Sequence, residues 1–81
     1  MENKLSIIGI FIQSPEAVSA VNELLHQYAD KIVGRMGLPY RDRGISVISV
    51  IIDAPADDIS ALAGKLGKIN GISAKTMQSK F

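Results

Sequence analysis

The sequence contains no cysteine and no tryptophan, and its only histidine is His26. Without cysteine the chain can form neither a disulfide nor a thiolate metal site. One histidine cannot by itself complete a zinc or nickel site, so we predict no resident metal or cofactor. Small domains commonly supplement a small core with disulfides, a metal or self-association. Since the first two are excluded, the sequence predicts self-association.

The sequence also lacks an excess of charge of one sign, because nine basic and eight acidic residues give a formal net charge of +1. This balance gives no general signal for nucleic acid or an anionic membrane. The apolar run over residues 5–12 is too short to span a bilayer, and it lacks the basic flank and cleavage site of a signal peptide. We therefore expect a cytoplasmic protein that binds neither nucleic acid directly nor a membrane.

What the sequence does have is a regular pattern of apolar segments. Hydrophobic residues make up 47% of the 81 residues, which predicts one folded domain over residues 1–81. Runs rich in Ile and Val predict strands, and apolar residues at three- and four-residue spacing predict helices. The predicted elements are a strand over Leu5–Ile12, a helix from Ser14-Pro15-Glu16 to about Ala29, strands over Lys31–Met36 and Ile45–Ile52, a helix from about Asp57 to Ile69, and a strand over Ile72–Gln78.

The order β-α-β-β-α-β predicts a ferredoxin-like α+β fold. Two β-α-β halves with right-handed crossovers form a four-stranded antiparallel sheet with both helices on one face. We expect Asp53-Ala54-Pro55 to break the third strand, and Asn70-Gly71 to form the turn before the last one. Residues 34–44 then connect the two halves.

Two of the predicted strands are apolar on both faces. A sheet with one open face should alternate apolar and polar residues. Instead, apolar side chains fall on both alternations of the first and third strands: Leu5, Ile7 and Phe11 against Ile8, Ile10 and Ile12, and Ile45, Val47 and Ile51 against Ile48, Val50 and Ile52. The face that the helices leave open therefore carries an Ile/Val patch, which is typical of an interaction surface. We expect this face to pack on another subunit.

The segment GRMGLPYRDRG, residues 34–44, holds the main polar cluster. A guanidinium offers a planar fork of donors that suits a carboxylate or phosphate, and Tyr40 adds a stacking surface with a hydroxyl. One interpretation is a solvated basic connection between strands; the other is a ligand or subunit contact. For the second interpretation we select Arg35, Tyr40 and Arg41 as contacts with a small anionic ligand or with a neighbouring subunit.

His26 is a further candidate for a binding residue. Histidine titrates near neutral pH and binds metals, so His26 could serve a site that several subunits share. The alternative is a polar helix residue paired with Asp30 four residues later.

No catalytic residue is predicted. Ser6, Ser46 and Ser49 have no base at recognisable spacing, and GKLGKINGI lacks the order of a Walker motif. We expect a protein that is not an enzyme.

The segments VNELLHQYADKIVGRMGLPYR and ISALAGKLGKINGISAKT carry a resemblance over nearly the whole chain, from about Leu5 to Thr76. The chain resembles the small ACT-like family of iron-only hydrogenase system regulators. That resemblance implies a ferredoxin-like fold and association through sheets into dimers or tetramers. The family is also similar to the ligand-binding domain of the nickel-responsive regulator. With a single histidine and no cysteine, this chain cannot reproduce that regulator's His/Cys nickel site, and it has no room for a ribbon-helix-helix segment.

The sequence and the resemblance together predict a stand-alone ACT-like regulatory or sensor domain, a transcriptional or hydrogenase-system regulator that binds a small ligand at a subunit interface. Two alternatives stay open. One is a protein–protein interaction module that uses the apolar sheet face. The other is a metal-responsive sensor to which several subunits contribute His26.

Overall fold

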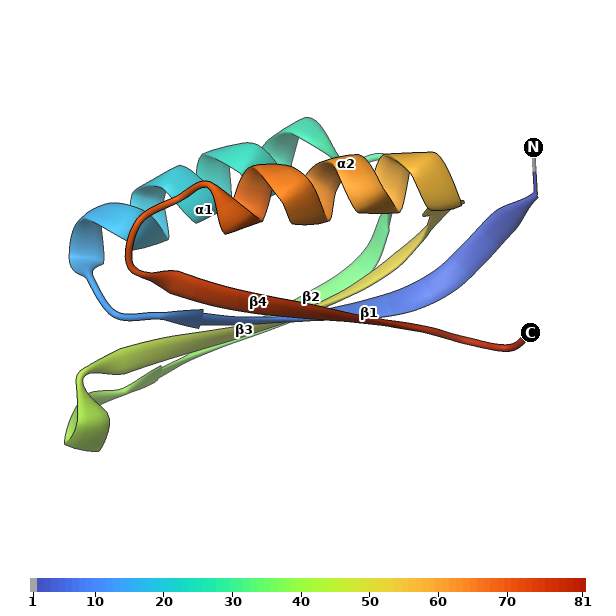
Figure 1. The fold of residues 1–81 in the computed structure, drawn as a ribbon. Coiled ribbons are helices and arrows are strands. Elements are labelled where there is room, and N and C mark those ends of the chain that lie inside the picture. Colours follow the sequence, from blue (N-terminus) through green and yellow to red (C-terminus); the bar gives the residue numbers. More distant parts are fainter. Residues whose placement is uncertain (1) are drawn as a thin grey trace.

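Residues 2–81, which the computed structural model describes, form a four-stranded antiparallel sheet with two helices on one face (Figure 1). The strand order is β2-β3-β1-β4. The elements are β1 (Asn3–Ile12), α1 (Pro15–Gln27), β2 (Ile32–Tyr40), a 3₁₀ turn η1 (Arg41–Arg43), β3 (Ile45–Pro55), α2 (Ala56–Gly67) and β4 (Ile72–Gln78). This arrangement confirms the predicted ferredoxin-like fold.

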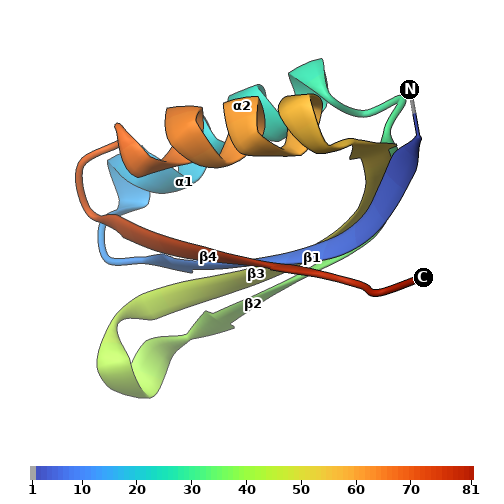
Figure 2. The same cartoon turned by 45° about the vertical axis from the view of Figure 1, so that its right-hand side comes forward.

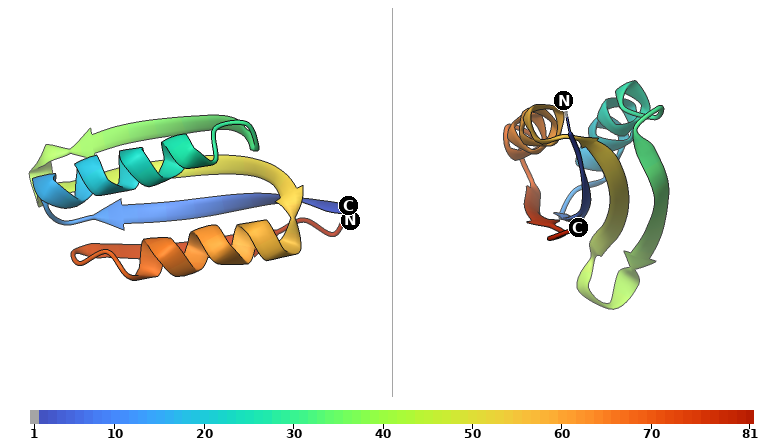
Figure 3. Two further views of the ribbon diagram at one scale, coloured as in Figure 1. Left: turned by 90° about the horizontal axis from the view of Figure 1, so that it is seen from above. Right: turned by 90° about the vertical axis from the view of Figure 1, so that its right-hand side faces the viewer.

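Each of the two helices covers one half of the same sheet face. Seen from above, α1 lies over the β2 and β3 side and α2 lies over β1 and β4 (Figure 3). Helix α1 begins as expected, because the Ser14 hydroxyl accepts a hydrogen bond from the Ala17 N–H at 3.3 Å and Pro15 occupies the first turn. It ends at Gln27, two residues before the predicted end.

The core lies between the helices and the sheet. It is built from one alternation of the two central strands and one stripe of each helix, as the apolar spacing predicts. Its fully buried large side chains are Ile8, Ile10, Ile12, Val21, Leu25, Val50, Ile52, Ile59, Leu62 and Leu66. The helices therefore cover the face that carries Ile8 and Ile10, and they leave the opposite face open.

Strands β2 and β3 are longer than the sequence predicts. Strand β2 continues past Met36 to Tyr40, which pairs with Ile45 across the η1 turn. Pro39 does not interrupt β2, because an edge strand needs no N–H on its outer side. The predicted break at Asp53-Ala54-Pro55 was wrong, since these residues pair with the start of β1 and extend β3 to Pro55. The β2–β3 turn bends away from the helix layer (Figure 2).

Helix α2 carries an exposed glycine whose replacement should stabilise the fold. A Cβ added to Gly64 would meet no atom within 4 Å. Gly64→Ala should raise the free energy of unfolding by about 0.5–1 kcal/mol, because alanine loses less conformational entropy in a helix. Urea denaturation followed by circular dichroism measures this change. The matched variant Ala61→Gly, at an exposed site on the same helix, should lower stability by a similar amount; a loss of stability in Gly64→Ala would contradict the expectation.

Candidate functional site

The open face of the sheet, defined as the surface opposite the helices, exposes large apolar side chains. Directly opposed residues of antiparallel strands point to the same side, so the register places Ile7 beside Ile51 and Met77, and Phe11 beside Val47. The apolar members of this face with 41–71% exposure are Leu5, Ile7, Phe11, Met36, Leu38, Tyr40, Ile51 and Met77. The predicted apolar patch on the second face is thereby confirmed.

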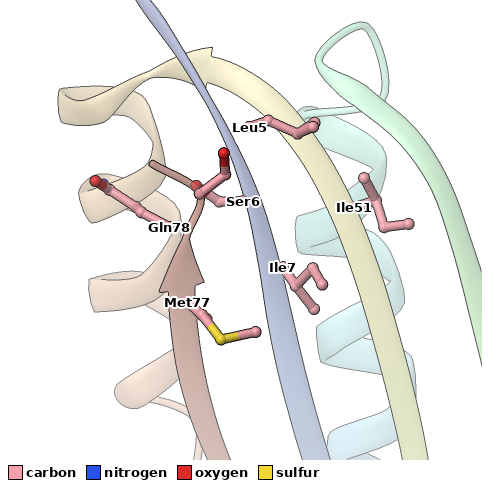
Figure 4. Close-up of a pocket in the computed structure, with 7 residues that line it drawn as sticks. Leu5, Ser6, Ile7, Ile51, Met77 and Gln78 are labelled. Atoms are coloured by element: carbon pink, nitrogen blue, oxygen red, sulfur yellow. The ribbon is translucent and has the colours of Figure 1, made fainter. Parts of the chain in front are cut away.

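The middle row of the open face is polar and contains one glycine. Gly9 lies between Ser49 and Lys75, and a Cβ added to it would meet no atom within 4 Å. On one side of this row a hollow of about 280 Å³ is lined mainly by Leu5, Ile7, Ile51 and Met77. Figure 4 shows these side chains standing on three adjacent strands. The face therefore offers both raised apolar side chains and space between them, which suits interdigitation with another surface.

A second depression lies on the other side of the sheet, between α1 and β2. We call it the α1–β2 groove, and its volume is about 370 Å³. Helix α1 contributes side chains at helical spacing, and β2 contributes two residues from its helix-facing side. The lining residues are Asn22, Leu25, His26, Ala29, Ile32 and Arg35. The groove thus has an apolar part and three polar side chains, none of them acidic.

Arg35 reaches this groove because of a bulge in β2. Ile32 pairs with Ile52, yet Gly34 pairs with Ile51, so the strand contains one extra residue between them. The bulge turns Arg35 toward α1, opposite buried Val50. There its Nη2 donates a hydrogen bond to Oδ1 of Asn22.

The Arg35 guanidinium has no acidic partner in the structure. Among residues 2–81 the two ion pairs join Lys4 to Glu2 at 3.2 Å and Lys31 to Asp30 at 3.4 Å. His26 follows Asn22 by one helical turn and is exposed beside the groove. A fixed positive charge with free N–H donors, next to an amide and an imidazole, can bind a small anion.

The structure brings some of the predicted contact residues together and separates others. Arg35 and His26 share the α1–β2 groove. Tyr40 points to the open face, where it lines a hollow of about 230 Å³ with Phe11 and Arg43. Arg41 is exposed in the η1 turn. The predicted set therefore divides into groove residues, an open-face residue and a turn residue.

Asn22 was missed by the sequence analysis. Its position four residues before His26 places both on one helix face, which is the signal that could have found it.

For metals, residues 2–81 contain no cluster of three His, Cys, Asp or Glu that could hold an ion. The alternative of a metal sensor using His26 thus depends on ligands from several subunits. No helix in this part of the chain has the length and apolar character needed to cross a membrane.

Comparison with known proteins identifies a family and a fold. The model of the TM1266-like family, described as "Iron-only hydrogenase system regulator, putative", matches residues 4–76. Protein TM1266 from Thermotoga maritima is 36% identical, with a TM-score of 0.93 over 98% of this chain and 100% of that one. A search of curated protein sequences finds no match.

More distant structures share the fold alone. The ACT domain of GTP pyrophosphokinase from Chlorobium tepidum is 17% identical, with a TM-score of 0.79 over 93% of this chain and 99% of that one. The C-terminal domain of MgtC from Mycobacterium tuberculosis is 12% identical, with a TM-score of 0.75 over 95% of this chain and 88% of that one. The fold is ACT-like, and with its family model covering residues 4–76 the chain belongs to the TM1266-like family of iron-only hydrogenase system regulators.

Proposed function

We propose that this chain is a stand-alone regulatory domain, without catalytic activity of its own, that self-associates through the open face of its sheet and binds a small ligand in the α1–β2 groove, on the opposite side of strand β2 from that interface. The regulator family and the ACT-like fold support the regulatory part of the proposal. The anionic ligand proposed from the sequence belongs to the α1–β2 groove with Arg35 and His26. Tyr40 belongs to the subunit contact.

The observation that carries this proposal is the apolar open face. Ile7 and Phe11 lie on a central strand, yet they are 41% and 50% exposed because nothing within residues 2–81 covers them. Contiguous apolar patches of this kind are rare on monomers. A second copy, packed about 10 Å away as stacked sheets are, would remove these side chains from water. A two-fold axis would let the same face serve both subunits.

Strand β2 offers a physical link between ligand and assembly. Arg35 points into the α1–β2 groove, while its neighbour Met36 points to the open face. A ligand that holds β2 against α1 would therefore favour one arrangement of the face over another. Because linkage is reciprocal, assembly would change ligand affinity by the same factor.

Sedimentation velocity on the purified chain tests the proposal. We expect a dimer or tetramer at micromolar concentration, because burial of the apolar open face drives association. A single species of 8.7 kDa at all concentrations would contradict self-association and leave the open face for a different protein partner. A moderate salt concentration should change the proportion of monomer and oligomer little, since the contact is mainly apolar.

A further inference from the structure

We infer that the α1–β2 groove binds a small monocarboxylate with a short aliphatic body, and that Arg35 holds its carboxylate. This inference rests on the proposed function, because it names the ligand class of the proposed regulatory site.

The polar side of the groove consists of three side chains that can donate hydrogen bonds, Asn22, His26 and Arg35. Arg35 uses Nη2 to reach Asn22 and keeps further N–H groups for another partner. Since Asn22 accepts from Arg35 through Oδ1, its amide Nδ2 remains a donor. His26 carries at least one ring N–H in either charge state. The hydrogen bond to Asn22 also fixes the plane of the guanidinium, which reduces the entropy lost when a carboxylate binds.

The charge of the groove favours one negative charge over two. Arg35 is the single fixed cation among the lining residues. The groove lies along the C-terminal half of α1, which ends at Gln27, so the negative end of the helix dipole opposes any anion there, and it opposes a dianion about twice as strongly as a monoanion. Phosphate sites of proteins instead use helix N-termini or several cations. A carboxylate matches both the charge and the planar fork of Arg35.

The apolar side of the groove defines the rest of the ligand. Ala29 and Ile32 supply aliphatic contacts next to the polar side chains, and buried Leu25 lies beneath them. The volume of about 370 Å³ is at the lower end of the range for small-molecule sites. A chain of a few methylene groups attached to the carboxylate fits this combination.

Titration of the ¹⁵N-labelled chain with sodium butyrate tests the inference. We expect amide shifts to concentrate at Asn22, His26, Ala29 and Arg35. Arg35→Gln should weaken butyrate binding about tenfold or more, because a hydrogen bond to a charged partner is lost. The control variant Lys68→Gln removes one positive charge at the end of α2, away from both the groove and the open face, and it should change affinity by less than about twofold, as distant sites act independently.

Several results would overturn the inference. The inference is wrong if butyrate causes no saturable amide shifts, or if the shifts lie outside the groove. It is also wrong if Arg35→Gln binds butyrate as tightly as the wild type, or if inorganic phosphate or nickel chloride binds more tightly than butyrate at the same residues. Sedimentation of the same samples separates this inference from the proposed function. If the chain assembles but does not bind butyrate, the ligand class is wrong and the assembly stands. If it is monomeric but binds butyrate through Arg35, the proposed self-association is wrong and the proposed ligand site is supported.

Discussion

Gly9→Lys is expected to abolish self-association while the domain remains folded. Gly9 lies at the centre of the open face, and a Cβ at this position meets no atom within 4 Å, so the monomer accommodates the new side chain. In a face-to-face assembly the new lysine would place a second positive charge beside Lys75, and its long side chain would hold the two sheets apart. We expect the dissociation constant to rise by about a hundredfold or more, which corresponds to about 3 kcal/mol. Sedimentation velocity measures the association, and far-ultraviolet circular dichroism checks the fold.

Gly64→Lys is the matched control for this variant. Gly64 is also an exposed glycine with no atom within 4 Å of an added Cβ, but it lies on α2 in the helix layer. The substitution adds the same side chain and charge away from the open face, and association should stay at the wild-type level. Normal assembly of Gly9→Lys would show that the open face is not the interface. Dissociation of Gly64→Lys alone would place the interface on the helices.

The fold could be predicted because its main signals are local. Alternation in residues 5–12 separates Ile8 and Ile10, which are buried, from Ile7 and Phe11, which are exposed. Ser14 and Pro15 mark the start of α1 through the chemistry of the helix end. The order of the elements and the handedness of crossovers then leave few possible sheets. Each of these inferences depends on residues close together in the sequence.

The strand ends could not be predicted in the same way. Asp53-Ala54-Pro55 has the composition of a break, yet its backbone pairs with Asn3, Lys4 and Leu5 of β1. The partner strand decides this outcome, and it lies about fifty residues away in the chain, where local propensity carries no information. Likewise β2 continues through Pro39 because its outer edge requires no donor.

The candidate site was only partly predictable for a related reason. Arg35 and Tyr40 are five residues apart on one strand, so alternation places them on opposite faces. That separation could have been predicted had β2 been recognised as reaching Tyr40. The proximity of Arg35 to His26 could not, because it depends on the bulge between Ile32 and Gly34 and on how α1 packs over β2. Gly34 is compatible with a bulge, since glycine within a strand often marks one, but it determines neither the position of the bulge nor the packing of α1.

Gly71→Ala is expected to destabilise the domain by about 2–3 kcal/mol through two separate effects. Gly71 has a φ of 86°, where an L-residue is strained. Its added Cβ would also lie 3.2 Å from Oγ of Ser14, the hydroxyl that caps α1. The backbone cannot easily move away, because the Gly71 carbonyl accepts a hydrogen bond from the Gln13 N–H at 2.7 Å. A methyl group at Gly71 thus strains the turn before β4. It also displaces Ser14, the residue that caps α1.

Gly44→Ala separates these two effects. Gly44 has a φ of 64°, but a Cβ there meets no atom within 4 Å, so this variant reports backbone strain alone, at about 1–2 kcal/mol. Combining Gly71→Ala with Ser14→Ala completes the test, and both are measured by urea denaturation. Since Ser14→Ala has already removed the cap, adding Gly71→Ala should then cost no more than Gly44→Ala. If the two changes are instead additive, the methyl group does not disturb the cap, and the cost at Gly71 comes from its backbone conformation.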